Sequence, residues 1–195
     1  MTAFDVGFGN TFLGYSIEVD NKVNIRSRQE KKKQGVIWGK NINHFDGRQE
    51  MLITIAEEVS LITTSTQRIL HHKNIIWKGH LTPQDWLLLL AESKFLIGLG
   101  DPLLGPSAMD AISVGCMYLN PIYDTPVRDG LFYSQHSYAA DKIGEPYVCS
   151  YHIKDKVTLK LCVEKALRTN LSPYTPPEFT KEVYQQRVAS IFHLD

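Results

Sequence analysis

The chain has 195 residues, of which 43% are hydrophobic and 22% are charged, and its 21 basic and 21 acidic side chains balance to a formal net charge of zero. These values are typical of one soluble globular domain, or of one large lobe of a longer enzyme. The zero balance gives no reason to expect nucleic acid or an acidic membrane surface as a partner. No apolar run reaches the roughly 18 residues of a transmembrane helix and no signal peptide is recognisable, which by itself indicates the cytosol.

The first third of the chain predicts short strands and one helix. Residues 16–19 are expected to form a short strand, and the polar residues 21–34 a loop or an exposed helix. A short apolar strand follows at Gly35–Trp38. Apolar residues with helical spacing then predict a helix that begins at Gln49, while residues 61–66 fit either the end of this helix or the start of a strand. The basic residues of the polar region are expected to be solvated: Arg26, Arg28, Lys31, Lys32 and Lys33.

The middle of the chain alternates strands with helices. Strands are expected at Asn74–Trp77 and Phe95–Leu99, and Thr82 followed by Pro83 is a helix start between them. A glycine-rich loop then leads to a second helix, for which Ser107 is the expected N-cap. Two more positions complete this pattern: Gly115 is expected to close that helix, and Met117 to begin the next strand.

The last third is less regular. Residues 121–147 are rich in turn-forming residues and are expected to make a long excursion over the strand ends. A last strand is expected at Val148–Tyr151, followed by an amphipathic helix at Lys156–Thr169 and a terminal helix at Lys181–Phe192. The alternation predicts an α/β fold with a doubly wound parallel sheet. We divide the chain into an opening segment (1–34), an α/β core (35–170) and a C-terminal tail helix (171–195).

Three cysteines lie far apart in the sequence and show no metal-ligand spacing. Cys116 follows a glycine and reads as a small buried residue. A disulfide between Cys149 and Cys162 is possible in a secretory compartment, but the spacing alone does not fix the geometry that such a bond needs.

The loop after the strand at Phe95–Leu99 is the best candidate for a ligand site. Ligands of open α/β sheets bind at the carboxyl ends of the strands, and the N–H groups at the start of the following helix favour an anion. Asp110, one turn into that helix, is either an acceptor for sugar hydroxyls or an acid that only complements the helix dipole. The candidate donor-binding residues are Lys40, Gly100, Asp101, Pro102, Gly105, Pro106, Ser107 and Asp110. The long excursion adds three possible contacts to a donor or an acceptor, namely Gln135, His136 and Tyr138.

Several motifs resemble one family of glycosyltransferases. They include Gly98-Leu-Gly100, Gly105-Pro106, Met109-Asp-Ala-Ile112, the stretch Ser-Gln-His-Ser-Tyr-Ala at 134–139, and Pro173-Tyr174 with Glu178-Phe-Thr180. The pattern is similar to the C-terminal lobe of GT-B enzymes, and more closely to the α-1,6-mannosylglycoprotein 6-β-N-acetylglucosaminyltransferases. The resemblance spans nearly the whole chain.

The resemblance implies a Rossmann-like lobe that binds UDP-GlcNAc as the donor substrate, without a metal or another cofactor. It implies transfer of GlcNAc, with inversion, in β-1,6 linkage to the α-1,6 mannose arm of N-glycans on glycoproteins. It also implies a type II Golgi membrane enzyme facing the lumen. The N-terminal lobe of that family carries the catalytic base, and we expect this lobe and the membrane anchor to be absent from this chain. The chain is therefore expected to contain no catalytic residue and not to complete turnover by itself.

Two departures from the family keep other functions open. The donor-site acids of the family fall at Leu104, where the acid is lost, and at Asp110, where Glu is shortened to Asp. The segment after Asn120 is shorter and lacks a lysine of the family, for which Arg128 is a possible substitute. The alternatives are an inactive or divergent nucleotide-sugar-binding module and, from periodicity alone, an unrelated flavodoxin-like binding domain.

Overall fold

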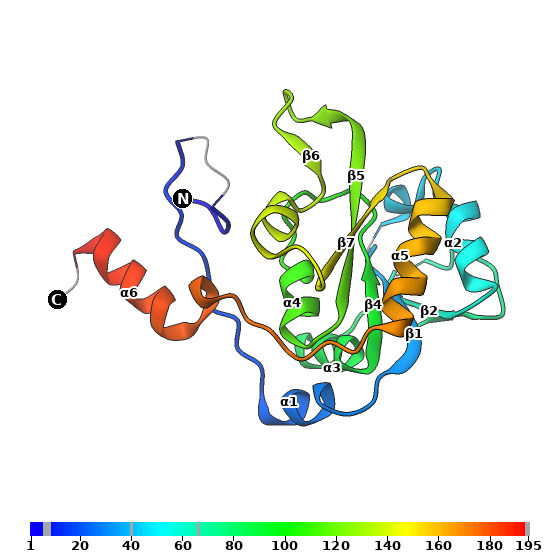
Figure 1. Cartoon of the computed structure of the whole chain (residues 1–195), viewed down its shortest axis with the longest axis horizontal. Coiled ribbons are helices and arrows are strands. Elements are labelled where there is room, and N and C mark those ends of the chain that lie inside the picture. Colours follow the sequence, from blue (N-terminus) through cyan, green and yellow to red (C-terminus); the bar gives the residue numbers. More distant parts are fainter. Residues whose placement is uncertain (6–8, 40, 66, 194–195) are drawn as a thin grey trace.

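The computed structural model describes residues 1–5, 9–39, 41–65 and 67–193, and one seven-stranded sheet organises them (Figure 1). The strands are β1 (Lys32–Ile37), β2 (Ser60–Thr63), β3 (Ile75–Trp77), β4 (Ser93–Ile97), β5 (Met117–Val127), β6 (Phe132–Ser134) and β7 (Val148–His152). Their spatial order is β3-β2-β1-β4-β5, and β5 pairs with both β6 and β7. Every pair is parallel except β5 with β6. The predicted doubly wound α/β sheet is confirmed.

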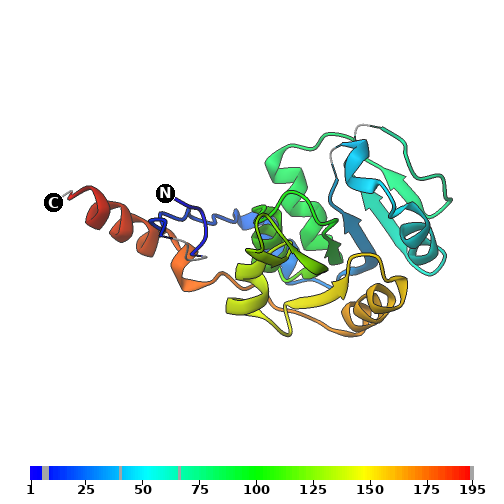
Figure 2. The same ribbon diagram turned by 90° about the horizontal axis from the view of Figure 1, so that it is seen from above.

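Helices cover both faces of this sheet. The helices that do so are α1 (Asn21–Ser27), α2 (Gln49–Ala56), α3 (Pro83–Glu92), α4 (Ser107–Ser113) and α5 (Lys156–Arg168). A further helix, α6 (Lys181–Phe192), lies away from the sheet (Figures 1 and 2), and shorter helical turns occur at Ile42–Phe45, Ala139–Ile143 and Pro177–Phe179. The buried residues of α2 and α5 share one core cluster with Phe95 and Ile97, whereas those of α1, α3 and α4 share the other with Leu96. Because successive side chains of a strand point to opposite faces, a single apolar run serves both cores.

The sequence predicts the N-terminal cap of α3 correctly and that of α4 incorrectly. Thr82 caps α3 as expected, since its side chain accepts a hydrogen bond from the N–H of Asp85, with Pro83 in the first turn. The expectation that Ser107 caps α4 is wrong. Pro106 occupies the N-cap position, and Ser107 is already the first helical residue. Gly115 does close this helix, at φ +69°, and a side chain there would meet the Leu171 carbonyl.

Two other expectations are wrong in the regions outside the regular core. Residues 121–147 are not one irregular excursion, because β5 continues to Val127 and forms an antiparallel hairpin with β6. Pro121 lacks an N–H group, but its carbonyl still accepts a hydrogen bond from the N–H of Gln135, so the hairpin tolerates it. Residues 16–19 form no strand, although the N–H of Ile17 donates to the Phe179 carbonyl.

The basic cluster is not uniformly solvated. Lys31 is buried, and its ammonium group donates hydrogen bonds to the carbonyls of Ala91 and Val114 at 2.7 and 2.9 Å. These carbonyls belong to the carboxyl-terminal ends of α3 and α4, where unpaired carbonyls need partners. Burial lowers the pKa of Lys31 to about 8. Lys31 therefore ties two helices to the start of β1.

The first residues of the chain and α6 lie on the same side of the molecule, away from the sheet (Figures 1 and 2). Phe4 packs against Tyr138 and Phe179, and so joins the first residues to the tail. None of the residues of α6 is buried. The helix is held by Arg187, whose guanidinium donates to the carbonyls of Leu13 and Glu178. The tail helix is thus anchored to the opening segment rather than to the sheet.

Candidate donor-binding pocket

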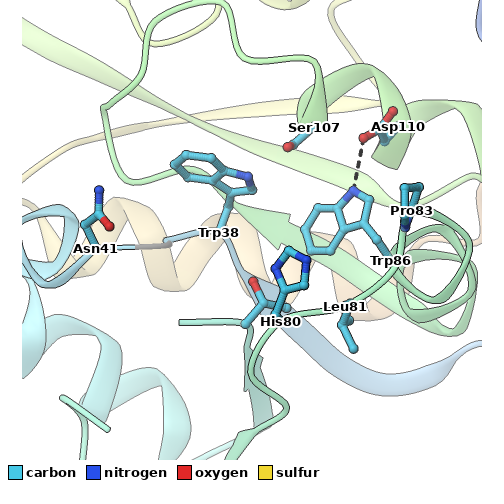
Figure 3. A pocket seen from close by; sticks show the side chains of 9 residues that line it. Trp38, Asn41, His80, Leu81, Pro83, Trp86, Ser107 and Asp110 are labelled. Carbon is cyan, nitrogen blue, oxygen red and sulfur yellow. Dashed lines mark hydrogen bonds between the residues drawn. The ribbon is translucent and has the colours of Figure 1, made fainter. Parts of the chain in front are cut away.

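A pocket opens beside the carboxyl ends of β1 and β4, where the strand order of the sheet reverses (Figure 3). Its volume is about 570 Å³. The lining residues are Trp38, Asn41, Thr64, His80, Leu81, Pro83, Trp86, Ser107 and Asp110. They follow β1, β2 and β3 or begin α3 and α4, so the doubly wound topology brings together positions that are far apart in the sequence. Such a switch point is the usual ligand site of open α/β sheets.

Asp110 is the acid of this pocket. The indole N–H of Trp86 donates a hydrogen bond to its Oδ2 at 3.0 Å, as the dashed line in Figure 3 shows. Burial raises the pKa of Asp110 to about 6, and the Trp86 hydrogen bond opposes part of this shift. Burial raises the pKa of the Tyr15 hydroxyl, and the negative charge of the nearby Asp110 raises it further. A carboxylate held in an apolar pocket at this energetic cost is typical of a functional site.

The loop between β4 and α4 is held from the foot of the β5–β6 hairpin. The side-chain carbonyl of Gln135 accepts from the N–H of Gly100 at 2.9 Å, and its amide donates to the Pro102 carbonyl at 3.0 Å. The backbone carbonyl of Gln135 accepts from the N–H of Leu104, and the Tyr123 hydroxyl donates to the Gly100 carbonyl. Gly100 itself sits at φ +91°, where a side chain would collide with Ile153. Gln135 is therefore a support of the loop.

The sequence matches a known family over almost its full length. The model of glycosyltransferase family 18 matches residues 1–194. The chain belongs to glycosyltransferase family 18.

Curated relatives of this family 18 chain are N-acetylglucosaminyltransferases. The human alpha-1,6-mannosylglycoprotein 6-beta-N-acetylglucosaminyltransferase A is 31% identical over 92% of the chain, and its rat counterpart gives the same values. The human B enzyme is 28% identical over 100% of the chain. The chain spans only 26% of the A enzymes and 27% of the B enzyme.

Solved structures agree on the fold of this family 18 chain. The UDP-GlcNAc 2-epimerase of Methanocaldococcus jannaschii, solved with UDP-GlcNAc and UDP, superposes with a TM-score of 0.58 over 90% of this chain and 49% of that one. A second structure of that enzyme gives 0.51. The sequence identity is 12% in both, so the likeness shows a Rossmann-like lobe and does not by itself assign a ligand.

The structure brings some of the candidate residues of this family 18 lobe together and separates others. Ser107 and Asp110 line the pocket, while Pro102 and Gly105 border a small crevice that also touches Ser107. The Asp101 side chain is 71% exposed and lies 3.8 Å from the His44 imidazole. Leu104, the position where the resemblance leads us to expect an acid, adopts φ +55° and packs partly against the core. Lys40 lies outside the described residues.

His136 and Tyr138 are buried beside the opening segment and do not line the pocket. The His136 ring accepts a hydrogen bond from the N–H of Ala139, and burial lowers its pKa to about 3, so the imidazole stays neutral. The Tyr138 hydroxyl donates to the carboxylate of Glu178. Tyr138 therefore joins the hairpin region to the tail, while the His136 ring packs edge-on against Phe4 of the opening segment.

Sequence reasoning missed three aromatic residues of the pocket: Trp38, His80 and Trp86. The position of Trp38 could have been recognised from the sequence, because it is the last residue of a predicted short apolar strand. Ligand contacts of parallel sheets gather at the carboxyl ends of the strands. Trp86 lies one turn after the Thr82 cap, but nothing local shows that α3 turns this ring toward α4. Among the described residues no cluster of three or more metal-ligating side chains forms, and no helix is long and apolar enough to span a membrane.

Proposed function

We propose that this chain is the nucleotide-sugar-binding lobe of an N-acetylglucosaminyltransferase that uses UDP-GlcNAc. The observation that carries the proposal is the pocket at the switch point of a family 18 lobe, with the partly buried carboxylate of Asp110 in its lining. The two indole rings of Trp38 and Trp86 offer flat apolar surface, and Asp110 and Ser107 offer polar groups for hydroxyls. A few polar groups in a largely apolar cleft are what a small polar ligand needs for orientation.

The reaction proposed for the whole protein is transfer of GlcNAc in β-1,6 linkage to the α-1,6 mannose arm of an N-glycan, with inversion and without a metal. Inversion requires a general base that removes the proton of the acceptor hydroxyl. We assign that base and most of the acceptor site to a part of the protein outside this chain, as in the family that it resembles. The role of this lobe is then to bind the donor and to hold its leaving group in place.

The proposed location is the lumenal side of the Golgi membrane. The disulfide between Cys149 and Cys162, which ties β7 to α5, supports this location. Disulfides persist in the oxidising secretory pathway and are rare in the cytosol. The buried third cysteine, Cys116, is free.

Isothermal titration of the folded chain with UDP and with UDP-GlcNAc tests the donor-binding proposal. We expect saturable binding of both ligands at a one-to-one ratio, weakened by Asp110→Ala. The Asp141→Ala variant, whose exposed side chain is not among those that line the pocket, is the matched control. Absence of binding at millimolar ligand by a chain shown to be folded contradicts the proposal.

Leu104 favours a second candidate function, a divergent module that binds the nucleotide but discriminates the sugar poorly. A missing hydrogen bond to a sugar hydroxyl weakens affinity by about 1–3 kcal/mol, which is roughly a fivefold to 150-fold loss. The Leu104→Glu variant tests this alternative. A tighter UDP-GlcNAc complex with unchanged UDP affinity supports the divergent module, and no change in either affinity argues against it.

A further inference from the structure

Trp86 and Asp110 form a side-chain pair across two helices at the wall of the pocket (Figure 3). The Trp86 nitrogen lies 3.0 Å from Oδ2 of Asp110, within the range of a good hydrogen bond. Both residues line the pocket, so this pair is at the ligand surface and is not part of the deep core. The hydrogen bond fixes one of the two carboxylate oxygens and leaves Oδ1 as the oxygen without a protein partner among the described residues.

The other polar groups around Asp110 do not replace this hydrogen bond. Tyr15, from the opening segment, has its hydroxyl buried without a hydrogen-bond partner among the described residues. His80, from the segment before α3, lines the same pocket. Within the part of the chain that the structure describes, no lysine or arginine forms an ion pair with Asp110 or contributes to its pKa shift. Trp86 is therefore the group that stabilises a negative charge on Asp110.

We propose that Trp86 is the positioning residue of the donor pocket, holding Oδ2 of Asp110 so that the ionised Oδ1 accepts a hydrogen bond from a hydroxyl of the nucleotide-sugar. This inference rests on the proposed function, because it assigns a role within the same site. The two oxygens of Asp110 have different partners in this proposal: Trp86 of α3 donates to Oδ2, and a hydroxyl of the ligand donates to Oδ1. A hydrogen bond to an ionised acceptor is about twice as strong as one between neutral groups, so ligand affinity depends on this arrangement.

The arrangement predicts a pH profile. If only the ionised acid accepts the hydroxyl, affinity falls about tenfold for each pH unit below the midpoint of the Asp110 titration. In the wild-type chain burial places this pKa at about 6. Loss of the indole N–H raises the pKa further, by about one unit, because a donor to the charged form is removed. At pH 6 the affinity of such a variant is then about fivefold below that of the wild type, whereas at pH 8.5 the two differ by less than about twofold.

The experiment uses Trp86→Phe and a chain with benzothienylalanine at position 86, a residue that keeps the double ring and lacks the N–H. Trp38→Phe is the control, since it alters another tryptophan of the same pocket that makes no hydrogen bond to Asp110. Each protein, including the reference that keeps Trp38 and Trp86, carries His80→Gln, which removes the other ionisable side chain of the pocket lining. The Asp110 titration is followed without ligand by carbon-13 NMR of its carboxyl group, and UDP-GlcNAc affinity is measured from pH 5 to pH 8.5.

We expect the Asp110 midpoint and the affinity profile to move together to higher pH in both position-86 variants. In the Trp38 variant we expect a weaker but unshifted profile. An unchanged Asp110 midpoint overturns the proposal, and so does a shifted midpoint with an unshifted affinity profile. Because the titration needs no ligand, it tests the Trp86 assignment even if UDP-GlcNAc does not bind, an outcome that refutes the proposed function separately. Should Trp86→Phe fail to fold, the benzothienylalanine chain, which preserves the packing, decides.

Discussion

Asp110 is expected to lower the stability of the folded chain at neutral pH, and the isosteric variant Asp110→Asn should therefore be more stable. Burial raises the pKa of Asp110 from 3.8 to about 6. A difference of roughly two units, at 1.36 kcal/mol each, corresponds to about 3 kcal/mol. The asparagine keeps a side-chain oxygen that can accept the hydrogen bond from Trp86, so little other than the buried charge changes.

The sign of the effect depends on pH. Below pH 3.8 the acid is protonated in both the folded and the unfolded chain, and the variant gains nothing. As pH rises from about 4 to about 6, the unfolded chain ionises freely while the folded chain resists ionisation, so the wild-type chain loses stability relative to the variant. Above pH 6 the difference is constant, at up to about 3 kcal/mol.

Urea unfolding of both proteins at pH values from 4 to 8 measures this difference. Groups such as Asp20 and Glu92, whose pKa values are lowered in the folded chain, contribute a pH dependence of the opposite sign, but it is the same in both proteins and cancels. Asp101→Asn, at a side chain that is 71% exposed, is the control and should change stability little at any pH. Equal stability of Asp110→Asn and wild type at pH 8, or a gain that persists at pH 4, refutes the reasoning.

Three further predictions concern the loop, the disulfide and the tail. Gln135→Met should lower the free energy of unfolding by about 2–4 kcal/mol, because the N–H of Gly100 and the Pro102 carbonyl both lose their partner. Tyr133→Ala, on the exposed side of the same hairpin, should change the free energy of unfolding little. Equal effects of the two substitutions would count against the role of Gln135 in supporting the loop. Reduction of the disulfide, whose cysteines are 13 residues apart, should lower stability by about 3 kcal/mol in urea unfolding, with no effect of the reductant in a Cys149→Ser/Cys162→Ser variant. Arg187→Ala should speed proteolysis of α6 without changing the unfolding of the core, since this helix buries none of its residues. An unchanged rate of cleavage would show that other contacts hold α6 in place.

The extent to which the sequence predicts this fold differs between elements. The strand at Phe95–Leu99 and the helix after Thr82 depend on local signals, namely a short apolar run and a cap followed by proline, and both are present within one residue or two of their predicted starts. The helix after Gly105 is predicted with the wrong cap, because the choice between Pro106 and Ser107 depends on the path of the loop that arrives there. Sequence reasoning missed the hairpin of β5 and β6, because Pro121 and Pro126 indicate turns. The strand tolerates them because its pairing with β6 is irregular, and this irregularity is visible only in the structure.

The sequence by itself therefore determines the alternation of strands and helices, the doubly wound class and, through its motifs, membership of the glycosyltransferase family. It also places Asp110 in the first turns of a helix at the ligand-binding edge. Only the tertiary structure decides what surrounds that acid, because Trp86 lies 24 residues away in the sequence and reaches it from another helix. In the same way, Gln135 supports Gly100 across 35 residues. Periodicity reports which face of an element is buried, but pKa values and loop geometry depend on contacts between elements, which no local pattern encodes.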